Sequence, residues 1–173
     1  PRLMYQDSGR AGDARALNDP AHWLVRFAPL VAIDGLDSLM LETTGCDHLY
    51  GGEPDMMQQV ARRLNRDGLP HAAGLASTPG AAWAMARAAS PLTILPKGEE
   101  RAGLADLPVS ALRLTTEAET LLRRFGLIRI GQLYGIDRSA LARRFQSKTR
   151  AEAVLLRLDQ ALGLRHGPVR PLR

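Results

Sequence analysis

Residues 31–45 have the sequence "VAIDGLDSLMLETTG", in which two apolar runs flank a short connection that carries two aspartates. Leu39, Leu41 and Thr43 alternate with Met40 and Glu42, and this period of two residues is typical of a strand with one buried face. The run before the connection is short, apolar and β-branched. The stretch therefore predicts two strands joined as a hairpin.

The segments after this hairpin predict further elements. "EPDMMQQVARRLNRDG" (residues 53–68) has apolar residues at helical spacing, acidic residues at its start and a glycine at its end. "PHAAGLAST" (residues 70–78) predicts a third strand, and "TPGAAWAMARAAS" (residues 78–90) a helix with Thr78 as N-cap and Pro79 in its first turn. The order strand, strand, helix, strand, helix favours an α+β fold, an antiparallel sheet with helices on one face.

Proline, glycine and charge cluster in "LPKGEERAGLADLPVSALRL" (residues 95–114), where the periodicity is interrupted. After it, "TTEAETLLRRFG" (residues 115–126) and the segments that follow predict short helices with tight links. We therefore expect two domains: residues 1–105 form the α+β part, and residues 106–173 a small all-helical domain.

Charge divides the chain in the same way. Residues 1–106 carry 10 Lys and Arg against 13 Asp and Glu, whereas residues 107–173 carry 13 against 5. The net charge of +5 is therefore concentrated in the helical part, where a polyanion could reach it. This pattern favours a surface that faces nucleic acid, although an arginine-rich composition with solvated helix faces would give the same count.

The composition excludes several other classes of protein. No apolar run approaches the roughly 20 residues that a membrane span needs, and the N-terminus has no charged-then-apolar signal pattern. The chain lacks an initiator Met, so we expect it to begin inside a longer protein. Its single cysteine, Cys46, excludes an internal disulfide framework, and "CDHLYGGE" (residues 46–53) matches no zinc spacing. We expect no metal site, no cofactor and no contact with membranes.

The hairpin and its flanks resemble a known family. "RFAPLVAIDGLDSLMLETTG" (residues 26–45) is similar to the palm hairpin of Y-family translesion DNA polymerases, which has a Ser-Ile-Asp-Glu turn. Pro29 matches the family's entry proline, and Thr44–Gly45 match the end of its second strand. In the turn, Asp37 stands at the family's aspartate and Ser38 at its glutamate.

The resemblance covers nearly the whole chain. It continues through "AAGLASTPGAAWAMARAAS" (residues 72–90), through "LADLPVSALRL" (residues 104–114), which leads out of the palm, and through "LLRRFGLIRIGQLYGI" (residues 121–136). It implies a partial palm followed by a thumb. In lacking these acidic residues, the chain resembles a catalytically degenerate branch of the family that works in bacterial mutagenic translesion synthesis.

The departures from the family pattern concern the catalytic chemistry. Family members join nucleotides with two metal ions held by carboxylates, and Ser38 offers only a neutral hydroxyl. Pro79 and Gly80 stand where active members carry Asn-Lys. The family's first acid and its fingers would lie upstream of this chain, and Asp34 should point away from Asp37 if the strand stays regular. The resemblance therefore implies an inactive remnant, Asp37 and Ser38, and no metal site.

The thumb part of the resemblance implies binding to DNA phosphates without reading of bases. The family's first thumb turn has Gly-Ile-Gly, but the matching "LRLTTEAE" (residues 112–119) has no glycine; the second turn, near Gly126, keeps its pattern. The expected DNA-binding residues are Arg123, Arg124, Arg129, Gly131, Arg143, Arg144, Lys148 and Arg150.

We expect a noncatalytic scaffold that binds DNA and helps to organise a bacterial SOS mutagenic translesion complex in the cytoplasm, at the nucleoid when it acts. The family resemblance implies three protein partners: the replication sliding clamp, a RecA-like accessory protein and an error-prone replicative-type polymerase. Two alternatives stay open at this point. One is an active error-prone Y-family polymerase fragment, and the other is a protein-interaction module that does not bind DNA.

Overall fold

A five-stranded sheet forms the first half of the protein. The structure, a computed structural model, describes residues 2–7, 17–89 and 91–167. The strands follow the order β2-β3-β1-β4-β5 across the sheet. Neighbours pair antiparallel except β4 and β5, which are parallel. Their bounds are β1 Arg2–Asp7, β2 Leu30–Ile33, β3 Ser38–Glu42, β4 His71–Ala76 and β5 Leu92–Ile94.

The predicted hairpin is confirmed as the pair β2–β3. Val31 lies opposite Leu41 and Ala32 opposite Met40. Leu41 belongs to a buried cluster on one face of the sheet, and Met40 belongs to another cluster on the opposite face. The alternation in the sequence therefore correctly predicted which residues share a face of β3. Both faces of the hairpin are buried, however, and not only one.

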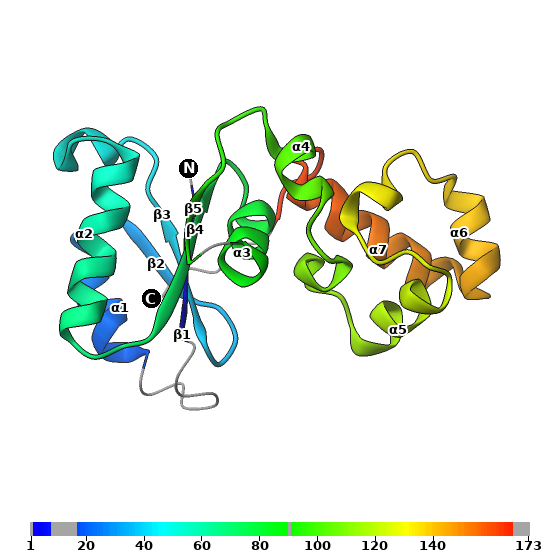
Figure 1. Cartoon of the computed structure of the whole chain (residues 1–173), viewed down its shortest axis with the longest axis horizontal. Coiled ribbons are helices and arrows are strands. Elements are labelled where there is room, and N and C mark those ends of the chain that lie inside the picture. Colours follow the sequence, from blue (N-terminus) through cyan, green and yellow to red (C-terminus); the bar gives the residue numbers. More distant parts are fainter. Residues whose placement is uncertain (1, 8–16, 90, 168–173) are drawn as a thin grey trace.

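Helices cover the sheet on both sides, which corrects the expectation that they lie on one face. Helices α1 (Asn18–Leu24) and α2 (Glu53–Arg66) pack on one face, and α3 (Pro79–Ala88) packs on the other (Figure 1). Buried residues of α3 are mostly alanines, so its sequence has no strong apolar stripe from which a face could be assigned. Helix α1 and strands β1 and β5 were not predicted, and β5 makes the sheet mixed.

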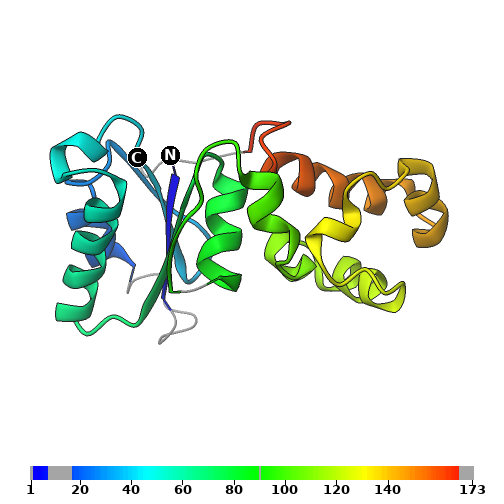
Figure 2. The same cartoon turned by 45° about the horizontal axis from the view of Figure 1, so that its top comes forward.

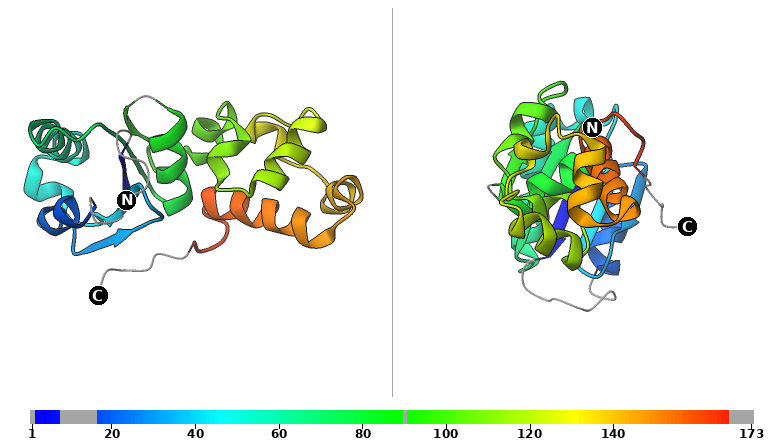
Figure 3. Two further views of the ribbon diagram at one scale, coloured as in Figure 1. Left: turned by 90° about the horizontal axis from the view of Figure 1, so that it is seen from below. Right: turned by 90° about the vertical axis from the view of Figure 1, so that its right-hand side faces the viewer.

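The second half of the protein is helical, as expected. It lies beyond α3 from the sheet, so that the molecule is elongated (Figures 2 and 3). Its elements are α4 Glu100–Ala105, η2 Val109–Leu112, α5 Thr116–Arg124, η3 Ile130–Leu133, α6 Arg138–Phe145 and α7 Lys148–Ala161. Side chains of Thr115, Asp137 and Ser147 accept hydrogen bonds from the first-turn amides of α5, α6 and α7 and so define where these helices begin. Within the described residues, no helix combines the length and the apolar character that a membrane crossing requires.

One apolar core joins the two halves. The cluster that contains Met40 continues through α3 into buried residues of α5, α6 and α7. Helix α7 returns toward α3, and the Thr78 hydroxyl donates a hydrogen bond of 2.8 Å to the carbonyl oxygen of Ala161. The division into domains at residues 105 and 106 stays a prediction, because this core runs across the boundary.

The buried register of β3 gives a first prediction. Leu41 is completely buried, so Leu41→Ala should lower the free energy of unfolding by about 2–5 kcal/mol through lost burial and a cavity. Urea denaturation measures this change. Leu49 is 68% exposed, and Leu49→Ala should therefore change stability by no more than about 0.5 kcal/mol. Equal effects of the two substitutions would mean that the register is wrong.

Candidate nucleic-acid interface

The tip of the β2–β3 hairpin holds the two residues of the expected catalytic remnant. Ser38 is completely buried at the start of β3, and its hydroxyl donates a hydrogen bond of 2.8 Å to the Asp37 carboxylate. Nη2 of Arg87, near the end of α3, lies 2.8 Å from each carboxylate oxygen of Asp37. The carboxylate that the resemblance places in a metal site is therefore paired with a guanidinium group.

The second aspartate of the connection is paired in the same manner. Oδ1 of Asp34 accepts a hydrogen bond of 2.5 Å from Nη2 of Arg113. Its other oxygen, Oδ2, is buried and has no hydrogen-bond partner. Arg113 has a positive φ of 57°, a conformation that only a small fraction of non-glycine residues adopt. This conformation turns the chain at the end of η2, from which the Arg113 side chain reaches the hairpin.

Trp83 of α3 connects the two ion pairs. The guanidinium carbon of Arg87 lies 4.5 Å from its ring centroid, and that of Arg113 lies 5.5 Å from it. Both distances allow attraction between the cation and the face of the ring. Asp34 and Asp37 therefore reach arginines that contact the same indole, and the expectation that they point apart, which assumed a regular strand, does not apply. The reason is that the chain turns between the two aspartates instead of continuing as a strand.

The start of α3 explains one departure from the family pattern. A Cβ atom added to Gly80 would lie 2.9 Å from Cα of Ala161, on the last turn of α7. A residue with a side chain at this position would require backbone to move. At the position where active family members carry a lysine, α7 therefore packs so closely against α3 that no side chain fits.

Carboxylates do not gather elsewhere in the part of the chain that the structure describes. No group of three or more His, Cys, Asp and Glu side chains there could hold a metal ion. Cys46 ends a turn that leads into the short 3-10 helix η1 (Asp47–Tyr50), and Asp47 and His48 are the first residues of this helix.

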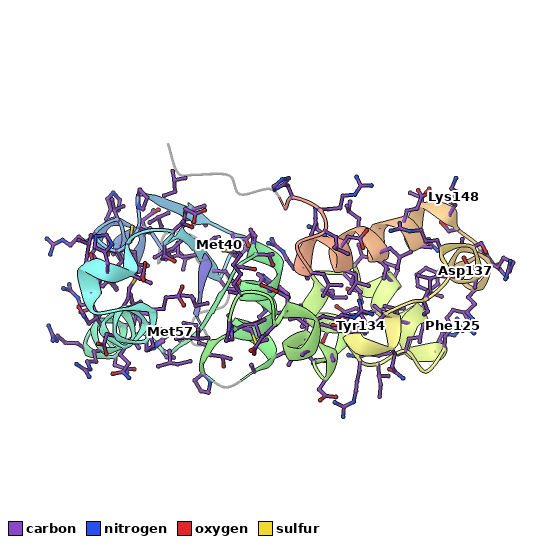
Figure 4. All side chains as sticks on the ribbon, turned by 90° about the horizontal axis from the view of Figure 1, so that it is seen from above. Met40, Met57, Phe125, Tyr134, Asp137 and Lys148 are labelled. Carbon is purple, nitrogen blue, oxygen red and sulfur yellow. The ribbon has the colours of Figure 1, made fainter. Side chains whose placement is uncertain are left out.

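Most of the predicted DNA-binding residues gather at the end of the helical half that is remote from the sheet. Arg123 and Arg124 occupy the last turn of α5, and Arg143 and Arg144 that of α6. The helices meet there through Phe125 and Phe145, whose ring centroids are 6.2 Å apart. Figure 4 shows Phe125, Asp137 and Lys148 at this end, far from Met40 and Met57. We call this end, with Arg123, Arg124, Arg143, Arg144, Lys148 and Arg150, the distal basic surface.

The basic residues of this surface differ in their partners. Nζ of Lys148 lies 3.8 Å from Glu152, and Arg150 lines a shallow hollow together with Glu117 of α5. Within the described residues, no acidic side chain pairs with Arg123, Arg124 or Arg144. These three guanidinium groups are therefore the ones most available to an anionic ligand.

The structure places Arg129 and Gly131 apart from the distal basic surface. Nη1 of Arg129 donates a hydrogen bond of 2.8 Å to the carbonyl oxygen of Asp106, and a Cβ on Gly131 would lie 3.0 Å from the carbonyl oxygen of Ala105. The Gln132 side chain accepts hydrogen bonds of 2.8 Å from the amides of Ile128 and Arg129. The amides of Ile128 and Arg129 are thus already bonded inside the protein.

The sequence analysis missed three residues of the hairpin site: Trp83, Arg87 and Arg113. Trp83 and Arg87 are four residues apart and so share a face of α3. That spacing was visible in the sequence. Which carboxylate each arginine would meet was not visible, because the partners lie 50 and 79 residues away in the chain.

Comparison with known proteins identifies the fold and the family. No protein-family model matches the chain. Over 90% of its length it superposes on the crystal structure of DinB from Sulfolobus solfataricus, with a TM-score of 0.68, 15% identity and 46% of that chain covered. An insertion ternary complex of Dbh DNA polymerase gives a TM-score of 0.64 at 16% identity, with 90% and 46% of the two chains covered. These likenesses define the fold as that of a Y-family polymerase.

Sequence comparison adds relatives. DNA polymerase IV of Dehalococcoides mccartyi strain CBDB1 is 29% identical over 147 residues, which are 83% of this chain and 36% of the relative. The chain belongs to the Y-family DNA polymerase superfamily. Within it, the protein ImuB of Caulobacter vibrioides strain NA1000 is 50% identical over 163 residues, or 94% of this chain and 34% of that protein. The chain thus spans about a third of the length of the curated relatives it matches.

The contact at Gly80 gives a second prediction. In an open helix, Gly→Ala stabilises a protein by about 0.4–1 kcal/mol because it restricts the unfolded chain. At Gly80 the added methyl group meets the backbone of α7, so Gly80→Ala should instead destabilise by about 1–3 kcal/mol. Urea denaturation gives the sign. A stabilised Gly80→Ala variant would show that α7 does not pack against the start of α3.

Proposed function

We propose that this chain is the DNA-holding part of a noncatalytic, ImuB-like scaffold in bacterial mutagenic translesion synthesis. The observation that carries the proposal is the pairing of both hairpin aspartates with arginines, Asp37 with Arg87 and Asp34 with Arg113. The 50% identity to ImuB over nearly the whole chain supports it.

The electrostatics of the hairpin tip oppose nucleotide transfer by two metal ions. Mg²⁺ binds through carboxylate oxygens, and in this chemistry it holds the triphosphate and activates the primer hydroxyl. At the hairpin tip each carboxylate already has a guanidinium partner, and a metal ion would have to displace it. A dication close to Arg87 and Arg113 would also be repelled by both. Ser38 adds no charge that could offset this repulsion.

The distal basic surface supports binding to DNA without sequence preference. Arginines at the ends of two helices offer their donors to phosphate oxygens, which carry no base information. Arg123, Arg124 and Arg144 have no acidic partner among the residues that the structure describes, and this leaves their charge uncompensated there. We propose that Arg143, Lys148 and Arg150 assist them, whereas Arg129 and Gly131 serve mainly to hold α4 and η3 together.

The proposal extends to the partners that the family resemblance implies. The scaffold would act at the nucleoid in the cytoplasm, as part of an SOS response. It would work with the sliding clamp, a RecA-like accessory protein and an error-prone replicative-type polymerase that supplies the catalysis. Two alternatives, an active polymerase and an interaction module without DNA binding, are outcomes of the two tests below.

Catalysis is tested by primer extension. Full-length protein with Mg²⁺ or Mn²⁺ should extend a primer on undamaged template no more than an Asp37→Ala variant does, because Asp37 is ion-paired and Ser38 replaces an acid. Ser38→Glu alone should also stay inactive, since Arg87 reaches within 3.4 Å of the Ser38 hydroxyl and would pair with a carboxylate placed there. Extension that disappears in Asp37→Ala would establish an active polymerase.

DNA binding is tested with blunt duplex DNA in a salt titration. If about four phosphate contacts form, the logarithm of affinity should fall against the logarithm of salt with a slope of about −3 to −4. Arg124→Ala/Arg144→Ala should flatten this slope by about 1 to 2 units, because a protein that makes fewer phosphate contacts releases fewer counterions when it binds. DNA sequence should have little effect on either protein.

A matched control tests the location of the contacts. Arg62→Ala/Arg66→Ala removes the same charge from the exposed surface of α2 and should leave duplex binding almost unchanged. Arg63 is left intact because it is paired with Asp67. If both double variants weaken duplex binding equally, the duplex contacts are not confined to the distal basic surface. If neither does, the interaction-module alternative gains support.

A further inference from the structure

A groove on the outer side of α1 and α2 combines aromatic rings with arginines. Its aromatic side is built by Trp23 and Phe27, from α1 and the turn after it, and by Tyr50 of η1. The Phe27 and Tyr50 rings stack with centroids 4.7 Å apart, and Trp23 meets the edge of Phe27 at 5.9 Å. All three rings are partly exposed. The groove encloses about 430 Å³, which is within the range of ligand sites.

The opposite side of the groove is a stripe of α2. Gln59, Arg62, Arg63 and Arg66 recur at the spacing that places side chains on one face of a helix, opposite its buried residues. Arg26 adds a fourth guanidinium group from the aromatic side. Two of the lining side chains are hydrogen-bonded to backbone: Gln59 donates to the carbonyl oxygen of Tyr50 at 3.2 Å, and the Tyr50 hydroxyl donates to the carbonyl oxygen of Arg26.

The charge of this groove is largely uncompensated. None of its lining residues is acidic. Arg63 pairs with Asp67 and lies over Trp23, 5.4 Å from the ring centroid. Among the described residues, no acidic side chain pairs with Arg26, Arg62 or Arg66. Three guanidinium groups therefore face solvent beside exposed aromatic rings.

We propose that this arginine–aromatic groove binds single-stranded DNA. Proteins hold single strands by stacking bases on aromatic rings while cations follow the phosphates, and every base can stack. The groove supplies both features a few ångströms apart, whereas an acidic peptide would use the arginines and leave the rings without a specific role. Helices α1 and α2, which carry most of the residues that line the groove, lie on the far side of the sheet from α3 and the helical half (Figure 1), so the groove is separate from the distal basic surface. The proposal goes beyond duplex binding, because duplex binding at the distal basic surface neither requires nor predicts a single-strand site in this groove.

The two double variants described above test this proposal in a crossed design. Each full-length protein is measured with blunt duplex and with an oligothymidylate of about 12 nucleotides, using fluorescence anisotropy. Arg62→Ala/Arg66→Ala should bind the oligothymidylate about 10- to 30-fold more weakly at about 0.1 M salt, because each lost contact to a single strand changes the slope by about 0.7. Its duplex affinity should stay within about twofold, while Arg124→Ala/Arg144→Ala should show the reverse pattern.

Photo-crosslinking locates the bound strand and keeps this proposal separate from the duplex site. An oligothymidylate that contains 5-iodouracil should form crosslinks to Trp23, Phe27 or Tyr50, identified by mass spectrometry. Crosslinks confined to residues 113–166, or unchanged oligothymidylate affinity in Arg62→Ala/Arg66→Ala, would overturn the proposal even if duplex binding behaves as expected. Polyglutamate of equal length should compete poorly. Equal competition would instead assign the groove to an acidic polypeptide.

Discussion

Helix α3 contacts the sheet and α7 at the same time, and the rest of the structure depends on this double contact. It is possible because the residues at both contacts are small. A Cβ on Gly74 of β4 would lie 2.4 Å from the carbonyl oxygen of Ala82, and one on Gly80 would lie 2.9 Å from Cα of Ala161. Backbone thus approaches backbone on both sides of α3. Protein interiors are close-packed, so an added methyl group at either contact would destabilise the fold.

The position of α3 determines the chemistry of the hairpin tip. Trp83 and Arg87 project from α3 toward the turn that carries Asp37, and η2, which packs on α3, brings Arg113 to Asp34. The same helix that joins the two halves therefore supplies the cation that pairs with Asp37, and it carries the 3-10 helix that brings the second cation to Asp34. A Y-family fold can in this way keep its frame while the charges at its centre are rearranged.

The sequence predicted the elements whose signals are local and missed those that depend on distant partners. The alternation around Met40 gave the hairpin and its register, and Thr78 marked the start of α3. The alanines of α3 form no apolar stripe that would show which face of the helix is buried, so the side of the sheet on which α3 packs was predicted incorrectly. Pairing of Arg87 with Asp37 and of Arg113 with Asp34 depends on the turn geometry and on tertiary structure.

Net charge summed over a long segment did not reveal the arginine stripe of α2. Residues 1–106 are acidic in total, yet α2 gathers arginines on one exposed stripe beside aromatic residues of α1, of the turn after it and of η1. A sum over a hundred residues does not report where on a helix the charges stand, whereas spacing of three and four residues does. The stripe could therefore have been found from sequence. Its aromatic partners could not, because the turn after α1 and η1 meet only in the folded protein.

The hydrogen bond from Thr78 to Ala161 joins residues that are 83 positions apart, within an apolar core that both halves share. A contact between residues so far apart in the chain stabilises the fold only after a large loop has been closed, at a cost in conformational entropy. Such contacts also place the two halves in one cooperative unit. Cutting the chain before α7 would therefore remove one wall of the core against which α3 holds the hairpin, and the stability of the sheet is set in part by residues at the opposite end of the sequence.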